Sequence, residues 1–304
     1  MNWFYLSLIP PFLFSVANHI DKYLLSRYIK GGGVGSLIIF SCLFSILILP
    51  VYFYFKPEVI DVNFVDVLLL IIVGVVNTLG VLFYLTALSK EDASIVVPLV
   101  QLTPISGYIF SFLFFGETIT GAQFFAALFI LTGSVMLCFS LSNGVLVFKW
   151  KTVMYMLIST ILFGLHGSLF KFVTIGENFV KSFFWEYVGL LISGICFFVF
   201  NKNFRSEFVS LVMNNKFNVF IVNSVNETIV FFANIIVALC FTLAPVSLVL
   251  AVGGLQSLFV FLIGLLIYVI FPKISKEEVK LGYLSYKGLA IVIIIYGGYL
   301  MSTA

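Results

Sequence analysis

A stripe of polar side chains follows one face of the first apolar segment of the chain. Ser15, Asn18, His19, Lys22 and Ser26 recur at intervals of three or four residues, with one adjacent pair, which places them on one side of an α-helix. Ionisable groups are costly inside a membrane span, so each one indicates a function or a specific partner. Lys22 could line a cavity and attract an anionic group of a ligand, or its ammonium group could extend to the membrane interface.

A second polar stripe lies on a late segment that is otherwise rich in Phe, Ile and Val. Asn226, Glu227 and Asn234 fall on one face of the expected helix. Glu227 is therefore a candidate proton carrier or a counter-ion to Lys22 or Lys171. A Glu–Lys pair that only joins two helices is an equally good interpretation.

Further polar residues within apolar segments could donate or accept hydrogen bonds from a ligand. Asn77 and Tyr84 are seven residues apart and could share a helical face, and Gln101 lies just before Pro104. A proline there can free a backbone carbonyl for a ligand or simply kink the helix. Asp21 is turned about 100° from the polar stripe of the first segment, so we expect it to face a neighbouring helix.

The remaining titratable residues do not form the motif of an enzyme. His166 is either a proton site or a packed, hydrogen-bonded residue. Glu186, a few residues into its segment, is expected at the membrane interface. Neither a Gly-rich phosphate loop followed by Lys and Ser or Thr nor a His-Glu-x-x-His motif is present. We therefore expect no enzymatic activity, no catalytic residue, no metal site and no cofactor.

The charges are too few for a water-soluble surface. Of 304 residues, 16 are Lys or Arg and 13 are Asp or Glu, which is 10% of the chain. Soluble domains carry roughly 25% charged residues. The apolar content of 62% and the mean hydropathy of +1.19 agree with a membrane protein. This composition excludes a soluble globular enzyme, a disordered chain and a nucleic-acid-binding protein, and the net charge of +3 is too small to indicate anionic partners.

The long apolar runs predict an all-α integral membrane protein with about ten transmembrane helices. A spanning helix needs about 20 apolar residues, and in lipid it satisfies its own backbone hydrogen bonds. The expected spans are residues 3–26, 34–55, 66–88, 93–115, 120–141, 152–173, 182–200, 217–240, 246–270 and 286–303. The loop 271–285 could carry a short interfacial helix.

Weak matches between the two halves predict an internal repeat. They are Phe14-x7-Lys22 with Phe163-x7-Lys171, Ala93-Ser94 with Val246-Ser247, and Ala126-x6-Gly133 with Ala290-x6-Gly297. The matches occur in the same order and in corresponding spans. Five spans per half force the halves into opposite orientations, which is the inverted-repeat architecture of secondary transporters. We expect a first repeat at 1–141, a linker at 142–151 and a second repeat at 152–304.

One segment carries a family resemblance. It runs through Tyr84-x2-Ala87-Leu88, Asp92-Ala93-Ser94, the proline pair Pro98 and Pro104, and Gly116-Glu117. This pattern resembles the EamA-type repeat of the drug/metabolite transporter superfamily. In the second half Ala244-Pro245-Val246-Ser247 and Gly253-Gly254 fit, but Phe271-Pro272 replaces the Gly-Glu turn. The resemblance implies a transporter and leaves its substrate open.

These features together favour a secondary active transporter, either exporter or importer, of a small organic metabolite. It would work by alternating access, driven by an ion gradient or by exchange. The expected binding or coupling residues are Asn18, His19, Lys22, Asn77, Tyr84, Gln101, Lys171, Asn226 and Glu227. The alternatives are a flippase for lipids or other amphipaths with a groove open to the bilayer, and a membrane scaffold without transport.

The expected surroundings are a plasma or inner membrane, a small-molecule substrate and a coupling proton or ion, with the chain as a monomer or homodimer and no nucleic acid bound. Lys and Arg concentrate in the loops after odd-numbered spans. The positive-inside rule then places both termini outside the cytoplasm. The family resemblance implies both termini inside, so the two arguments disagree on orientation.

Overall fold

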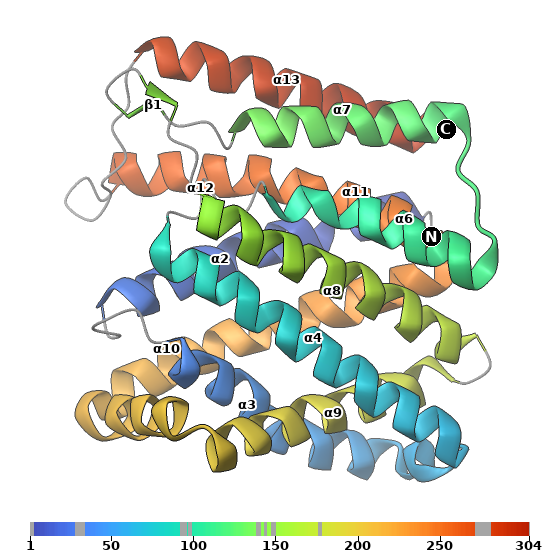
Figure 1. The fold of residues 1–304 in the computed structure, drawn as a ribbon, viewed down its shortest axis with the longest axis vertical. Coiled ribbons are helices and arrows are strands. Elements are labelled where there is room, and N and C mark those ends of the chain that lie inside the picture. The colour runs from blue at the N-terminus through green and yellow to red at the C-terminus, as the bar shows by residue number, and fades with distance from the viewer. Residues whose placement is uncertain are drawn as a thin grey trace.

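The structure is a bundle of helices with one very short hairpin (Figure 1). This computed structural model describes residues 3–27, 34–91, 96, 99–137, 141–142, 145–146, 150–175, 178–270 and 281–303. The hairpin pairs β1 (Leu141–Ser142) with β2 (Val145–Leu146) where the expected linker begins.

The first part of the chain forms helices where the apolar runs predict them. They are α1 (Trp3–Ser7), α2 (Ile9–Arg27), α3 (Gly35–Phe55), η1 (Pro57–Ile60), α4 (Phe64–Lys90), η2 (Val100–Leu102), α6 (Thr103–Phe115) and α7 (Gly121–Leu137). Some ends have a clear local cause. Asn63 accepts a hydrogen bond from the backbone N–H of Val65 at the start of α4. Gly116 ends α6 with a φ of 63°, a left-handed conformation that favours glycine.

The second part of the chain is also helical, and it contains one long helix, α10. Its helices are α8 (Trp150–Thr174), α9 (Phe179–Phe200), α10 (Lys202–Leu243), α11 (Val246–Val252), η3 (Gly253–Leu255), α12 (Gln256–Ile270) and α13 (Leu281–Thr303). Helix α10 begins well before the span expected at 217–240, because Asn201 caps it by accepting from the N–H groups of Asn203 and Phe204. The interfacial helix suggested for 271–285 falls largely outside the described residues.

Six helical segments of the described chain are long and apolar enough to cross a membrane. They are Gly35–Phe55, Phe64–Lys90, Trp150–Thr174, Phe179–Phe200, Val219–Leu243 and Val246–Ile267. Shorter apolar helices lie at Thr103–Phe115, Gly121–Gly133 and Gly288–Leu300. Many large apolar side chains are exposed on these helices, as expected of surfaces that face lipid. The chain is therefore a multi-pass membrane protein.

Contacts between the two parts come in matching sets. Helix α4 packs on α8 and α9, and α10 correspondingly packs on α2 and α3. Helix α6 packs on α8, and α12 packs on α2. In Figure 1, α4 and α10 end on opposite sides of the molecule, whereas the two ends of the drawn chain lie on the same side.

Helices α7 and α13 form a separate pair at one edge of the bundle (Figure 1). A Cβ added to Gly133 would lie 2.8 Å from the backbone oxygen of Ala290, and one added to Gly297 would lie 3.0 Å from that of Ala126. The two Ala-x6-Gly motifs of the sequence therefore pack reciprocally on each other. This close approach needs glycine, because any side chain would meet backbone.

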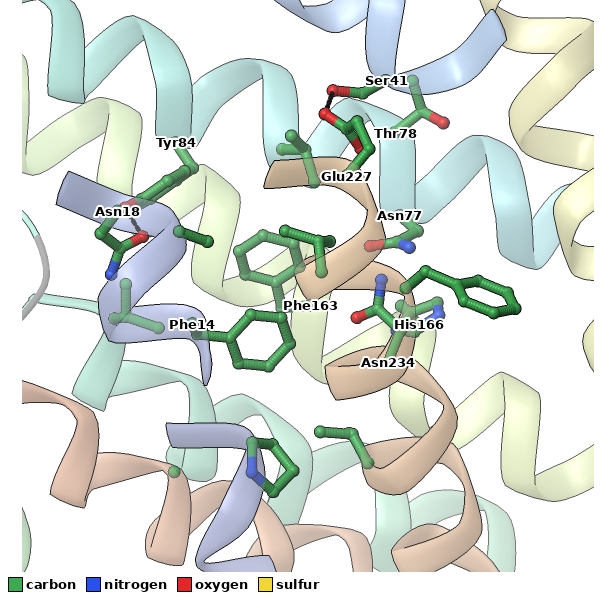
Figure 2. A pocket seen from close by; sticks show the side chains of 18 of the residues that line it. Phe14, Asn18, Ser41, Asn77, Thr78, Tyr84, Phe163, His166, Glu227 and Asn234 are labelled. Atoms are coloured by element: carbon green, nitrogen blue, oxygen red, sulfur yellow. Dashed lines mark hydrogen bonds between the residues drawn. The ribbon is translucent and has the colours of Figure 1, made fainter. Parts of the chain in front are cut away.

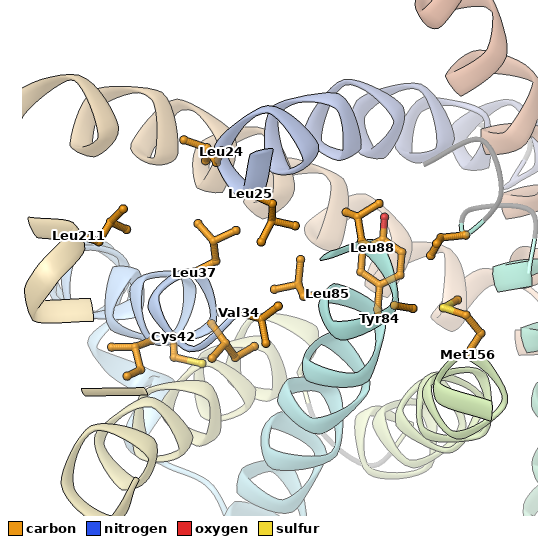
Figure 3. Close-up of a cluster of buried hydrophobic side chains, with 14 of the residues drawn as sticks. Leu24, Leu25, Val34, Leu37, Cys42, Tyr84, Leu85, Leu88, Met156 and Leu211 are labelled. Carbon is orange, nitrogen blue, oxygen red and sulfur yellow. The ribbon is translucent and has the colours of Figure 1, made fainter. Parts of the chain in front are cut away.

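A buried apolar cluster fixes the ends of α2 and α4 against the start of α3 (Figure 3). Leu24 and Leu25 of α2, Leu37 of α3, and Leu85 and Leu88 of α4 are all at most 5% exposed. The cluster sets the relative rotation of these three helices. Their other faces carry the polar groups of the site described next.

Candidate functional site

A cavity of about 270 Å3 lies between the two parts of the chain. Helices α2, α3 and α4 line it from one part, and α8, α9 and α10 from the other. Figure 2 shows its polar and aromatic lining. Described residues of α7 and α13 do not contribute to the lining, which agrees with the separate position of that pair.

One wall of the cavity joins α2 to α4 through the predicted residues Asn18 and Tyr84. The Tyr84 hydroxyl donates to Asn18 Oδ1 at 2.6 Å, and the two residues are 5% and 9% exposed. Asn18 Nδ2 has no hydrogen-bond partner among the described residues. The hydrogen bond orients the amide of Asn18 at the cavity wall.

Two carboxylates also line the cavity. Glu227 of α10 accepts a short hydrogen bond from the Ser41 hydroxyl of α3. Asp21 of α2 accepts from Asn226 Nδ2 of α10 at 2.7 Å. All four residues line the cavity. The sequence predicted Glu227 and Asn226 here. The sequence also predicted that Asp21 would face a neighbouring helix. Asp21 does contact α10, and it lines the cavity as well.

Amide and ring side chains complete the lining. Asn77 of α4 and Asn234 of α10 lie close to each other in Figure 2, with His166 beside them. His166 Nε2 lies 2.8 Å from Glu186 Oε1, and Glu186 is 4% exposed. Glu186 was expected at the membrane interface, yet within the protein it is a buried partner of His166.

Two helices are interrupted at the cavity. The 3-10 segments η2 and η3 contact each other, and Val100 of η2 and Gly253 of η3 line the cavity. Short 3-10 segments within helices often mark functional positions. A Cβ added to Gly253 would meet no atom within 4 Å, so this glycine faces open space. The side chain of Gln101, predicted at the other interruption, lies outside the described part of the chain, whereas Gln256 lines the cavity.

Three predicted site residues point to helix ends or neighbouring backbone and are absent from the lining. The Lys22 ammonium donates to the backbone oxygens of Leu88 and Glu91 at 3.2 and 2.7 Å. Lys171 Nζ lies 2.7 Å from Glu117 Oε1 and donates to the Ala244 oxygen at 2.9 Å. His19 Nε2 lies 3.0 Å from the Val260 oxygen.

The two lysines make equivalent contacts. Glu91 is the residue that follows α4, and Ala244 is the residue that follows α10. Both are extended, with φ and ψ of −133° and 166° for Glu91 and −148° and 167° for Ala244. Each lysine thus donates to the carbonyl of the residue that follows a helix. A lysine near a helix C-terminus is favourable to the exposed carbonyls there.

Helix α8 has closely packed glycines where α2 has polar residues. When the two halves of the sequence are matched, Gly164 and Gly167 correspond to Ser15 and Asn18. A Cβ on Gly164 would lie 2.7 Å from the Gly107 nitrogen, and one on Gly167 would lie 2.9 Å from the Phe241 ring. The polar groups of the cavity therefore come mainly from α2, α4 and α10.

Comparisons with known proteins agree with these observations. The model of the EamA-like transporter family matches residues 4–139. No curated protein matches the sequence. Among solved structures, one described as the crystal structure of a protein aligns with 98% of this chain and 94% of its own, at 16% identity and a TM-score of 0.62. That similarity is one of fold. The first part of the chain, residues 4–139, is thus similar to the EamA-like transporter family, which lies within the drug/metabolite transporter superfamily.

Proposed function

We propose that the protein is a secondary active transporter of a small organic metabolite, and that the cavity is its substrate site. The observation that carries this proposal is the position of the cavity: it contains polar side chains, lies between the two parts of the chain and is bordered by both helix interruptions. Transporters with inverted repeats bind substrate at such interruptions near the middle of the membrane.

The proposed mechanism is alternating access of two inverted five-helix repeats, residues 1–141 and 152–304 joined by 142–151. The matched helix contacts, the equivalent lysine contacts and the reciprocal packing of α7 on α13 support this symmetry. With no nucleotide-binding motif in the sequence, an ion gradient or solute exchange would drive uphill transport. We place the protein in the plasma or inner membrane.

The proposed substrate contacts are the cavity-lining members of the expected set, namely Asn18, Asn77, Tyr84, Asn226 and Glu227. Lys22 and Lys171 would act at the helix ends and not on the substrate. A scaffold without transport would have no need of a cavity beside these polar groups, so the cavity favours transport.

A solute-exchange experiment tests this proposal. Proteoliposomes containing the purified protein are loaded with a mixture of metabolites, and the loss of each metabolite is followed by mass spectrometry. Gly253→Leu should reduce transport at least about ten-fold, because its side chain would occupy the cavity, and the Gly253 φ of −50° accepts any residue.

Gly121→Leu is the matched control. A Cβ on Gly121 also meets no atom within 4 Å, but this residue lies on α7, away from the cavity. Transport equal to wild type is expected. Equal transport by the Gly253→Leu variant would show that the solute takes another route.

A further inference from the structure

The charged residues of the cavity are of one sign. Its described lining includes the carboxylates of Asp21 and Glu227 and contains no Lys or Arg. His166 also lines the cavity and could carry a positive charge. Its ring lies against Glu186, so that pair adds no net positive charge. The electrostatic character of the cavity is therefore acidic, opposite to what a substrate-binding Lys22 would produce.

The hydrogen bonds to the two carboxylates come from neutral groups. Asn226 Nδ2 donates to Asp21, and the Ser41 hydroxyl donates to Glu227. Neither carboxylate takes part in an ion pair with another described residue. Because Asn226 and Glu227 are consecutive, both carboxylates lie beside one turn of α10. Glu227 is buried and Asp21 is partly buried. Two such carboxylates without a cation are unfavourable, so this arrangement favours a positive partner from outside the chain.

The side-chain oxygen of Asn226 has no hydrogen-bond donor among the described residues. Asn226 is 1% exposed. A buried carbonyl oxygen of this kind is normally paired. A charged nitrogen that carries N–H groups would supply that donor and would neutralise the neighbouring carboxylates with the same atoms.

Aromatic rings form much of the remaining wall. Phe14 and Phe163, which are equivalent in the sequence repeat, lie next to each other between the polar groups in Figure 2, and Tyr187 and Phe231 also line the cavity. The faces of aromatic rings attract cations and accept apolar groups. The volume of about 270 Å3 lies just below the usual range for ligand pockets, which is about 300–1,000 Å3.

We propose that the cavity binds a small organic cation, an amine with an apolar body, with Asp21 and Glu227 as its counter-charges. The Asn226 carbonyl accepts from the ammonium group, and the aromatic wall contacts the apolar body. This inference rests on the proposed function and specifies its substrate class.

The test compares three probes of similar size and different charge. Phenethylamine is cationic, 2-phenylethanol is neutral and 3-phenylpropanoate is anionic, and a series of short aliphatic monoamines and diamines extends the cationic set. Binding to the purified full-length protein is measured by the rise in its melting temperature, because a ligand of the folded state stabilises it. At least one amine should bind more tightly than its neutral and anionic counterparts.

Substitutions of the two carboxylates test whether they bind the amine. Asp21→Asn and Glu227→Gln should each weaken amine binding at least about ten-fold, and both keep an oxygen that can accept from Asn226 or Ser41. Glu207→Gln is the matched control. Glu207 accepts from the Gly35 N–H outside the cavity, and its amide equivalent can still do so. Binding by this control should equal that of wild type.

Several results would overturn the cation assignment. These are preferential binding of the neutral or anionic probe, no stabilisation by any amine, and wild-type amine binding by both cavity variants. The exchange experiment separates this failure from failure of the proposed function. If an uncharged or anionic metabolite is transported and Gly253→Leu blocks its transport, the proposed function is supported and the cation assignment is wrong. If no solute of any charge is transported, the proposed transport function is wrong.

Discussion

Lys171 shows how one long side chain can connect several segments of this membrane protein. Its ammonium group extends from α8 to the Glu117 carboxylate after α6 and to the Ala244 carbonyl after α10. The side chains of Lys171 and Glu117 are 10% and 21% exposed, so the pair is only partly screened by solvent. Removing one partner of such a pair leaves the other charge poorly solvated.

Lys171→Met should therefore lower the free energy of unfolding by about 2 to 3 kcal/mol, somewhat less than the loss of a partner in a fully buried pair costs, because this pair is partly exposed. The melting temperature of the purified protein reports the change. The double variant Lys171→Met with Glu117→Gln should lose less than the sum of the single changes, because these residues interact directly. Additive losses would show that the ion pair contributes nothing to stability.

At the scale of elements, glycines decide how closely two helices approach. Gly133 and Gly297 bring α7 and α13 together by reciprocal contacts with Ala290 and Ala126. In lipid such association depends on packing, since lipid chains are as apolar as the helices. The pair lies outside the cavity, so its loss should affect stability more than ligand binding.

Gly133→Ala and Gly297→Ala should each destabilise the protein by about 1 to 3 kcal/mol, the usual cost of overpacking a close contact. Gly288→Ala on α13 is the control, because a Cβ there meets no atom within 4 Å. In detergent, the melting temperatures of Gly133→Ala and Gly297→Ala should be lower than that of Gly288→Ala. If Gly288→Ala were as unstable as Gly133→Ala, the close helix contact would not be the cause of the destabilisation.

At the scale of the whole molecule, the proposed inverted repeat requires equivalent helix ends to lie at opposite membrane faces. Helices α4 and α10 end on opposite sides in Figure 1. Their last residues, Lys90 and Leu243, both have exposed side chains. These two positions therefore offer a direct measurement of topology.

We expect Lys90→Cys and Leu243→Cys, each in a variant without the four native cysteines, to react with a membrane-impermeant maleimide from opposite sides of the membrane. One should be labelled in intact cells and the other only after permeabilisation. Labelling of both from the same side would contradict the inverted repeat. The result also decides between the two orientations, since charge bias places the termini outside and the family resemblance places them inside.

The sequence by itself determined the membrane class, the approximate positions of most helices and the faces that carry Asn18, Asn226 and Glu227. These features depend on the lengths of apolar runs and on helical periodicity, which are local properties. The EamA-like pattern, confirmed over residues 4–139, is equally a property of contiguous residues.

Only the tertiary structure decided which polar groups share the cavity. Lys22 lies on the same stripe as Asn18, but its long side chain reaches carbonyls 66 and 69 residues away at the end of α4, while Asp21 beside it lines the cavity. The pairing of His166 with Glu186 likewise depends on how α8 packs near α9. The acidic character of the site follows from these rotations and side-chain lengths, because periodicity states which residues share a face but not which partner each side chain reaches.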